Sequence, residues 1–298
     1  MQSAKLALEK LPEKTGGVGF RTDFLVGEDA KVLNFATNGF AGDGHFDLEQ
    51  AYIDILAPLG KGLDIKAGKF VTLHGAEVIE AKDNWNYSRS LLFGYAIPFT
   101  HTGIRVSYPI LDTLTGYLGV NNGWDDVKDN NKGKSIESSF AWAPKDWLSF
   151  NLAGMYGPEE TANSHSNRAL VDFVATYQPL KKLTLKVNTD YAQEDDLVAP
   201  GKAATWSGVA GYARYDFNDK WSLSNRTEYF TDPNGVRVTS GTPADYWENT
   251  STLELRPYKN LITRLEYRYD KSSQDIYAQG SKLTDHQNTI GAEAIYVF

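Results

Sequence analysis

The chain has 298 residues, a formal net charge of −8, no cysteine and 13% aromatic residues. The acidic balance excludes nucleic-acid binding, which needs a basic face. The lack of cysteine excludes disulfides, thiolate metal sites and covalently attached haem. Mean hydropathy is −0.42, and no apolar run approaches the roughly 18 residues of a membrane-spanning helix. A membrane β-barrel is still allowed, because its strands are apolar on one face only.

Alternating apolar and polar side chains predict fifteen strands, most of roughly the ten residues that a tilted membrane strand needs. The alternation slips near Gln50 and Ala51, where we expect a β-bulge. In chain order, the expected strands cover residues 2–10, 18–26, 45–57, 63–72, 100–110, 114–122, 135–143, 147–157, 168–178, 183–193, 206–217, 221–231, 247–257, 261–271 and 287–298.

The connections between these strands alternate between short and long. The short ones are residues 58–62, 110–113, 144–147, 179–182, 218–220 and 257–260. The long ones are residues 72–100, 122–134, 157–167, 194–205, 232–246 and 272–286, and a polar segment at 28–44 precedes the third strand. Short periplasmic turns with long external loops are typical of a transmembrane antiparallel up-and-down β-barrel, here a single domain over residues 1–298.

The two strand faces differ in chemistry. Along residues 261–271, Leu265 and Tyr267 alternate with Glu266 and Arg268. In a membrane barrel the apolar side chains contact lipid and the ionised ones line water. The alternative is a soluble sheet with its apolar face covered by a second layer, but the sequence predicts no helices to supply that layer.

The last strand ends the chain on Tyr296 and Phe298. A terminal aromatic strand of this kind resembles the assembly signal of bacterial outer-membrane barrels, which implies contact with the outer-membrane assembly machinery. A barrel whose two ends lie in the periplasm has an even number of strands. We therefore expect sixteen strands in a complete chain, with the first strand and the signal peptide missing from this sequence.

Several stretches resemble the OmpL-like group of β-barrel porins of Gram-negative bacteria. The most specific is DNWNYSRSLLF at residues 83–93, and the resemblance is densest between residues 17 and 125. The other matching stretches are residues 17–23, 62–72, 77–80, 98–103 and 121–125. The resemblance implies a porin-like barrel in the bacterial outer membrane.

A barrel of sixteen strands is too wide for side chains to fill, so we expect an aqueous pore. The loop at residues 74–99 combines charges with apolar rings, and we expect it to fold into the pore and narrow it. The alternatives are a lid resting on the rim and, for the charges, solvated residues that pair with their neighbours. The candidate constriction and lumen residues are Glu77, Glu80, Asp83, Arg89, Arg105, Lys186, Arg214, Arg226, Arg264, Glu266 and Arg268.

Other side chains suit the two membrane interfaces, where aromatic rings are enriched. These interface candidates are Trp124, Trp142, Trp147, Tyr156, Tyr177, Trp221, Tyr267, Tyr296 and Phe298. His45, His74 and His101 fall near the expected external rim, and with Glu77 they form a weak candidate metal site. The simpler interpretation is that they are ordinary rim residues.

The sequence favours a porin for passive diffusion of small hydrophilic solutes and ions across the outer membrane. No nucleophile-elbow pattern or other catalytic constellation stands out, so we expect no enzyme and no cofactor. The expected partners are outer-membrane lipids, the solutes and the assembly machinery, and the sequence also permits a homo-oligomer. The alternative function is a scaffold, sheath or adhesin barrel without free conductance.

Overall fold

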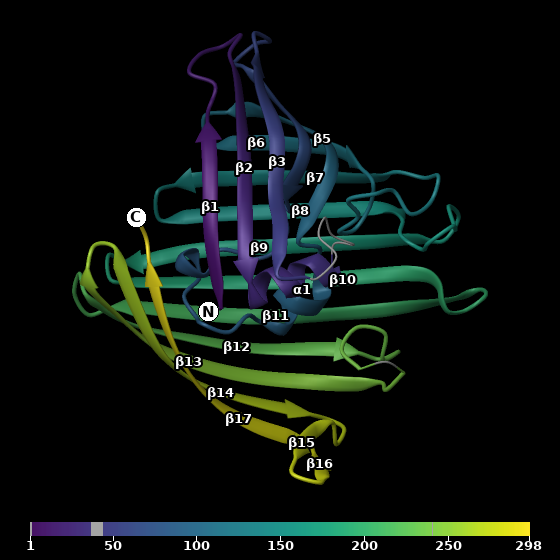
Figure 1. Ribbon diagram of the computed structural model, residues 1–298, viewed down its shortest axis with the longest axis vertical. Helices are drawn as coiled ribbons and strands as arrows, with labels where there is room; N and C mark the ends of the chain where they lie inside the picture. The colour runs from purple at the N-terminus through teal and green to yellow at the C-terminus, as the bar shows by residue number, and fades with distance from the viewer. Residues whose placement is uncertain (1, 37–43, 240) are drawn as a thin grey trace. The chain divides into compact units, whose positions relative to one another are not determined.

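The computed structural model describes residues 2–36, 44–239 and 241–298 (Figure 1). Fifteen strands form one sheet in which each strand neighbours the next along the chain, from β1 to β14 and then β17. Among the described residues, no helix combines the length and the apolar character that crossing a membrane requires.

The bounds of the elements are as follows. The strands are β1 Ser3–Lys10, β2 Val18–Gly27, β3 Phe46–Ala57, β4 Leu63–Val71, β5 Thr100–Leu111, β6 Leu114–Asn121, β7 Ser135–Lys145, β8 Leu148–Pro158, β9 Asn167–Leu180, β10 Leu183–Ala199, β11 Lys202–Asp216, β12 Trp221–Asp232, β13 Ala244–Tyr258, β14 Leu261–Ser272, β15 Tyr277–Gln279, β16 Lys282–Thr284 and β17 His286–Tyr296. The helical segments are α1 Glu28–Ala36, η1 Ala81–Asp83 and η2 Leu92–Ala96.

The chain divides into two compact units. The first comprises Met1–His74, Pro98–Pro144 and Asn151–Leu170, and the second comprises Gly75–Ile97, Lys145–Phe150 and Val171–Phe298.

The first unit contains the antiparallel meander from β1 to β7. The expected bulge is confirmed, because Asp23 of β2 faces Gln50 while Phe24 faces Leu48, which leaves Glu49 as the extra residue of β3. The polar segment after β2, for which the sequence predicted no helix or strand, begins with α1. Residues 37–43 of that segment lie outside the described residues.

The second unit contains β10 to β14 and β17, paired antiparallel in sequence. The prediction of a long loop at residues 194–205 is wrong, because β10 continues to Ala199 and β11 already begins at Lys202. The extended hairpin closes through Gly201, which has a φ of +76° that glycine adopts without strain. Residues 194–196 are all acidic, so the alternation of apolar and polar side chains did not indicate that the strand continues through them. The loop predicted at 272–286 likewise contains the small hairpin of β15 and β16.

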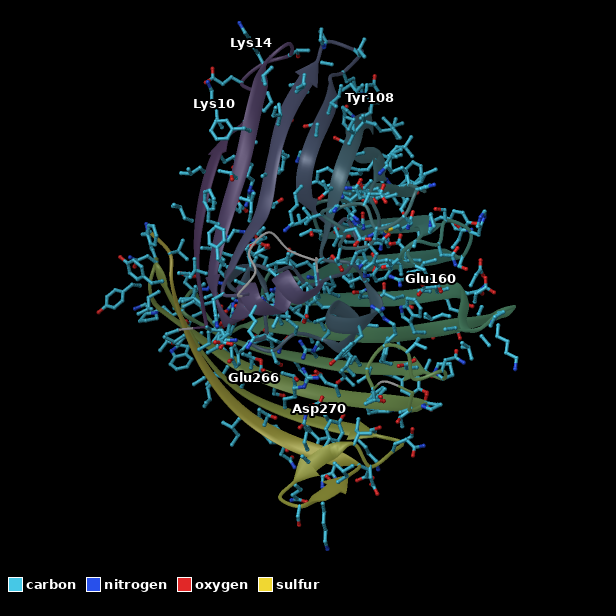
Figure 2. All side chains as sticks on the ribbon, turned by 45° about the vertical axis from the view of Figure 1, so that its right-hand side comes forward. Lys10, Lys14, Tyr108, Glu160, Glu266 and Asp270 are labelled. Carbon is cyan, nitrogen blue, oxygen red and sulfur yellow. The ribbon has the colours of Figure 1, made fainter. Side chains whose placement is uncertain are left out.

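The sheet faces of the second unit have opposite chemistry. Large apolar side chains are exposed on one face: Leu185, Tyr191, Val209, Leu223, Trp247, Leu253, Leu265 and Tyr267. Ionised side chains are buried on the other: Arg226, Glu228, Glu248, Glu254, Arg264, Glu266 and Asp270. Figure 2 labels Glu266 and Asp270, which lie on β14. This distribution inverts that of a water-soluble sheet, and a hydrocarbon environment around the apolar face explains it.

The first unit shows the same inversion. Leu6, Ile53, Ile104 and Leu118 are exposed. Asp23, Lys69, Arg105 and Glu137 are buried and joined to partners of opposite charge. The expected separation of apolar and ionised faces therefore holds in each unit taken by itself.

A charge on the apolar face tests the lipid contact. Leu265 lies within β14 and is 55% exposed. Replacing Leu265 by Arg should lower the unfolding free energy in lipid vesicles by about 2–4 kcal/mol, because a charge in hydrocarbon is poorly solvated. The matched control is Leu283→Arg, since Leu283 is 59% exposed in the β15–β16 hairpin. Equal effects of the two substitutions would contradict a lipid-facing position for Leu265.

Candidate functional site

The segment Gly75–Ile97 of the second unit packs on the polar face of β10 to β14, and we call it the anchored loop. Asn84 holds its first half in shape by accepting from Val78 N at 2.9 Å and donating to Val78 O at 2.7 Å. Arg89 donates to the carbonyls of Val78, Ile79 and Tyr87 at 3.1, 2.7 and 3.1 Å. The two side chains satisfy polar backbone groups that have no helix or strand partner.

Carboxylates of the sheet accept hydrogen bonds from the backbone of the anchored loop. Glu228 of β12 accepts from Leu91 N at 2.6 Å and Leu92 N at 3.2 Å, at the start of η2. Glu266 of β14 accepts from Tyr87 N at 2.7 Å and Ser88 N at 2.9 Å. Hydrogen bonds from backbone N–H groups to carboxylates are stronger than neutral ones, so these contacts fix the loop position.

Cations of the sheet bind the carbonyls of the same loop. Arg264 donates to Ala81 O at 2.9 Å and to Asn84 O at 2.6 Å. Arg268 donates to Arg89 O at 2.7 Å, and Lys186 donates to Ala76 O at 3.1 Å. Arg237, in the loop between β12 and β13, donates to Tyr95 O at 2.6 Å. Both signs of charge on the sheet therefore bind backbone rather than facing open water.

The centre of this contact is Arg226, which is wholly buried. Its guanidinium lies 2.7 Å from Glu77 of the anchored loop and 2.5 Å from Glu248 of β13, and it donates to Ser88 O at 2.8 Å. A buried ion pair of this kind costs desolvation to form, but removing one partner leaves an uncompensated charge.

The groups around Glu77 lower the pKa of its carboxyl. Burial alone would raise its pKa, but the Arg226 and Arg89 guanidiniums and the Ser90 N–H outweigh burial. The pKa of Glu77 therefore lies below its ordinary value of about 4.5.

Aromatic side chains complete the packing of the anchored loop. Lys186 Nζ lies 4.7 Å from the ring centroid of Trp85, and the same ring meets Tyr212 edge-on at 6.4 Å. Trp206 is wholly buried and donates its Nε1–H to Ala96 O at 3.2 Å. These contacts exclude water from the ionic groups nearby and strengthen their attraction.

Seven of the predicted constriction residues meet at this loop. They are Glu77, Arg89, Lys186, Arg226, Arg264, Glu266 and Arg268. The others have different partners. Asp83 is exposed and pairs with Lys82 at 2.7 Å, while Glu80 is half-buried in the loop. Arg214 pairs with Glu254, and Arg105 pairs with Glu137 at 2.8 Å within the first unit.

Two further acids of the polar face belong to these networks. Glu248 and Glu254 are both on β13 and both almost fully buried. Strand alternation places them on the same face as Thr250 and Thr252, so the signal was present in the sequence. Apart from Arg256 on β13 itself, their arginine partners come from other strands, and the cross-strand placement that pairs them is not visible in single-strand periodicity.

The predicted interface aromatics lie mainly beside the short turns. Trp147 and Tyr177 meet edge-on at 5.8 Å. Trp124 instead lies in a loop under the Arg168 guanidinium, 4.6 Å from its ring centroid. Tyr156 lies near the long-loop end of β8 and Tyr267 within β14. The exposed members of the set are Trp142, Trp147, Tyr156, Tyr177, Trp221, Tyr267, Tyr296 and Phe298.

The three histidines occupy two different settings within the first unit. His74 and His101 are buried with ring centroids 6.4 Å apart, and both contact the Thr72 hydroxyl. Burial and the nearby His101 lower the pKa of His74 to about 3, so this imidazole is neutral. His45 is exposed and lies 3.7 Å from Glu28. The metal site stays a prediction.

An antiparallel meander with an exposed apolar face and a buried ionised face defines an outer-membrane β-barrel protein. The chain belongs to the family described as "Putative beta-barrel porin-2, OmpL-like", which matches residues 1–298. The resemblance seen in the sequence is thereby confirmed. Family membership places the chain among porin-like barrels, in the lipid of the bacterial outer membrane.

Solved outer-membrane proteins share this fold at low identity. The outer-membrane channel DcaP of Acinetobacter baumannii is 10% identical with a TM-score of 0.69, covering 99% of this chain and 85% of DcaP. OmpT of Vibrio cholerae in its trimer form is 14% identical with a TM-score of 0.65, covering 99% and 92%. An anion-selective porin from Comamonas acidovorans is 10% identical with a TM-score of 0.65, covering 98% and 86%. No curated protein matches the sequence significantly.

The buried pair of Glu77 and Arg226 yields a pH-dependent prediction. Glu77→Gln should lower the unfolding free energy by about 3 kcal/mol at pH 7, because Arg226 keeps its charge and loses a partner. A carboxylate with a depressed pKa stabilises the fold above its unfolded pKa of about 4.5, and this contribution disappears as the pH falls through the folded value. The difference between wild type and variant should therefore shrink at pH 3, as measured by urea unfolding in detergent.

Asp83→Asn is the matched control in the same loop. Asp83 pairs with Lys82 at the exposed surface, so its loss should cost less than about 1 kcal/mol. A Glu77→Gln effect no larger than that of Asp83→Asn would contradict the buried pair.

Proposed function

We propose that the protein is a passive diffusion channel for small hydrophilic solutes and that the anchored loop narrows its aqueous path. Membership in a porin family supports the first part. The observation that carries the second is the set of contacts between the anchored loop and the ionised face of β10 to β14. A water-filled interior is the environment that an ionised strand face requires.

The alternative of a lid on the rim fits the contacts less well. Arg226 and Glu266 lie near the middle of β12 and β14, rather than at the strand ends where a lid would rest. Lys186 and Asn188, which bind Ala76, lie several residues into β10. Attachment at mid-strand favours a constriction inside the channel.

The scaffold hypothesis differs from the porin hypothesis in one measurable respect. An anchored loop bound by many charge-assisted hydrogen bonds is static, so a channel narrowed by it should be open without a gating step. Planar bilayers containing the purified protein should therefore show stepwise, stable conductance. A protein that shows no conductance, although circular dichroism shows that it is folded, would contradict the channel hypothesis and support the scaffold hypothesis.

Deletion of residues 78–95 tests the constriction separately. Conductance should rise severalfold, because the narrowest cross-section limits ion flow. The matched control is deletion of residues 277–284, which form the β15–β16 hairpin and have no part in the anchored loop. If the wild type conducts and the first deletion leaves the conductance unchanged, the anchored loop does not form the constriction, although the protein is still a channel.

The C-terminal strand suggests the partner for insertion. Tyr296 and Phe298 are exposed and their rings stack with centroids 6.5 Å apart. We infer that this terminal aromatic pair contacts the outer-membrane assembly machinery, as the sequence resemblance implies.

A further inference from the structure

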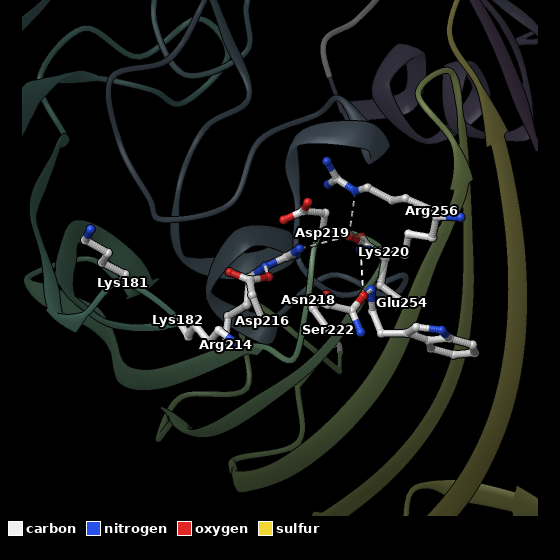
Figure 3. A pocket seen from close by; sticks show the side chains of 11 residues that line it. Lys181, Lys182, Arg214, Asp216, Asn218, Asp219, Lys220, Ser222, Glu254 and Arg256 are labelled. Carbon is white, nitrogen blue, oxygen red and sulfur yellow. Dashed lines mark hydrogen bonds and ion pairs between the residues drawn. The ribbon is translucent and has the colours of Figure 1, made fainter.

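A second polar feature of the second unit lies apart from the anchored loop, at the short turns after β9 and β11. Here a cavity of about 450 Å³ opens among charged side chains (Figure 3). Five cationic and three acidic side chains line it, an excess of two positive charges in a chain of net charge −8. The charged lining residues are Lys181, Lys182, Arg214, Lys220, Arg256, Asp216, Asp219 and Glu254.

Strand register places this cavity on the polar face of the sheet. Asp216 faces Ser222, Ser222 faces Glu254, and Glu254 faces Arg264, so all four side chains lie in one cross-strand row. Arg264 binds the anchored loop. The cavity therefore belongs to the face that carries ionised groups, opposite the exposed apolar side chains.

The arginines at this cavity have unused hydrogen-bonding capacity. Glu254 accepts from Arg214 at 3.0 Å, from Arg256 at 2.9 Å and from Arg264 at 2.9 Å; the first two contacts are drawn in Figure 3. Arg256 uses only its Nε in this way, and its side chain is 44% exposed. Among the described residues, none accepts a hydrogen bond from its two terminal nitrogens.

A buried hydroxyl in the same wall also lacks a partner. Ser222 is 3% exposed, and its Oγ forms no hydrogen bond within the described part of the chain. An unsatisfied buried polar group costs free energy, so such groups normally bind something. Lys181 and Lys220 add ammonium groups to the lining that pair with no carboxylate among the residues described. Donors thus converge on the cavity in excess of the acceptors present.

We propose that this cavity binds a small oxyanion, the phosphate or carboxylate group of a solute, through Arg256, Ser222 and the neighbouring lysines. The planar guanidinium fork matches the oxygen spacing of such anions, and a hydroxyl donor complements it. A free solute is favoured over a lipid headgroup because the cavity lies on the polar face of the sheet. A role of this site in binding anions during transport rests on the proposed channel function. Binding of the oxyanion does not depend on that function.

Inorganic phosphate is the probe, titrated into the folded protein in a maltoside detergent and followed by calorimetry and ³¹P line broadening. Arg256→Gln should weaken phosphate binding about tenfold or more, because charge-assisted hydrogen bonds are lost. Ser222→Ala should weaken it about threefold. Both variants should fold, since Glu254 retains Arg214 and Arg264 and the Ser222 hydroxyl has no protein partner to lose.

Lys259→Gln is the matched control, because it removes one positive charge beside the β13–β14 turn without lining the cavity. Its phosphate affinity should equal that of wild type. No saturable phosphate binding, or equal losses in Arg256→Gln and Lys259→Gln, would overturn the site. Binding of dihexanoyl phosphatidylglycerol without binding of free phosphate would overturn the assignment to a solute.

Conductance of the same samples separates this inference from the proposed function. A conducting protein that binds no phosphate would overturn the oxyanion site and leave the channel intact. A protein that shows no conductance but binds phosphate in a manner that depends on Arg256 would support the oxyanion site and contradict the channel function.

Discussion

Charge compensation on the polar face of the sheet is the constraint on which the second unit depends. Arg226 is wholly buried, and it is stabilised there only because Glu77 and Glu248 lie within 2.7 Å of its guanidinium. Leaving one such charge alone would cost several kcal/mol. The anchored loop supplies one of the two carboxylates, so the loop and the sheet stabilise each other.

Backbone groups of the loop take part in the same compensation. Glu228 and Glu266 accept from its N–H groups, while Arg264 and Arg268 bind its carbonyls. An irregular segment has few backbone partners of its own, and buried polar backbone must find partners. Ionised side chains on these strands therefore order a loop segment that has little regular structure of its own.

Strand periodicity made much of this fold predictable. Alternation predicted most of the strands, their two faces and a bulge near Gln50, which the structure has at Glu49, because each depends on residues adjacent in sequence. It failed at residues 194–199, where polar side chains continue as strand beyond the expected end. The residues of the contact were found in part: Glu77, Arg226 and Glu266 stood out as charges, but their partners depend on cross-strand register and loop folding.

The central claim is that apolar side chains face lipid along each strand, whereas the ionised side chains that alternate with them lie on the opposite, polar face. The chain has no cysteine, so single substitutions such as Leu265→Cys, Tyr267→Cys and Tyr269→Cys, against Asp270→Cys and Ser272→Cys, allow spin labels to be placed cleanly on β14. In lipid vesicles, labels at odd positions should collide frequently with dissolved oxygen, whereas labels at even positions, where Asp270 and Ser272 are 2% exposed, should collide with it rarely. Accessibility without a period of two, or with the two faces exchanged, would contradict the account.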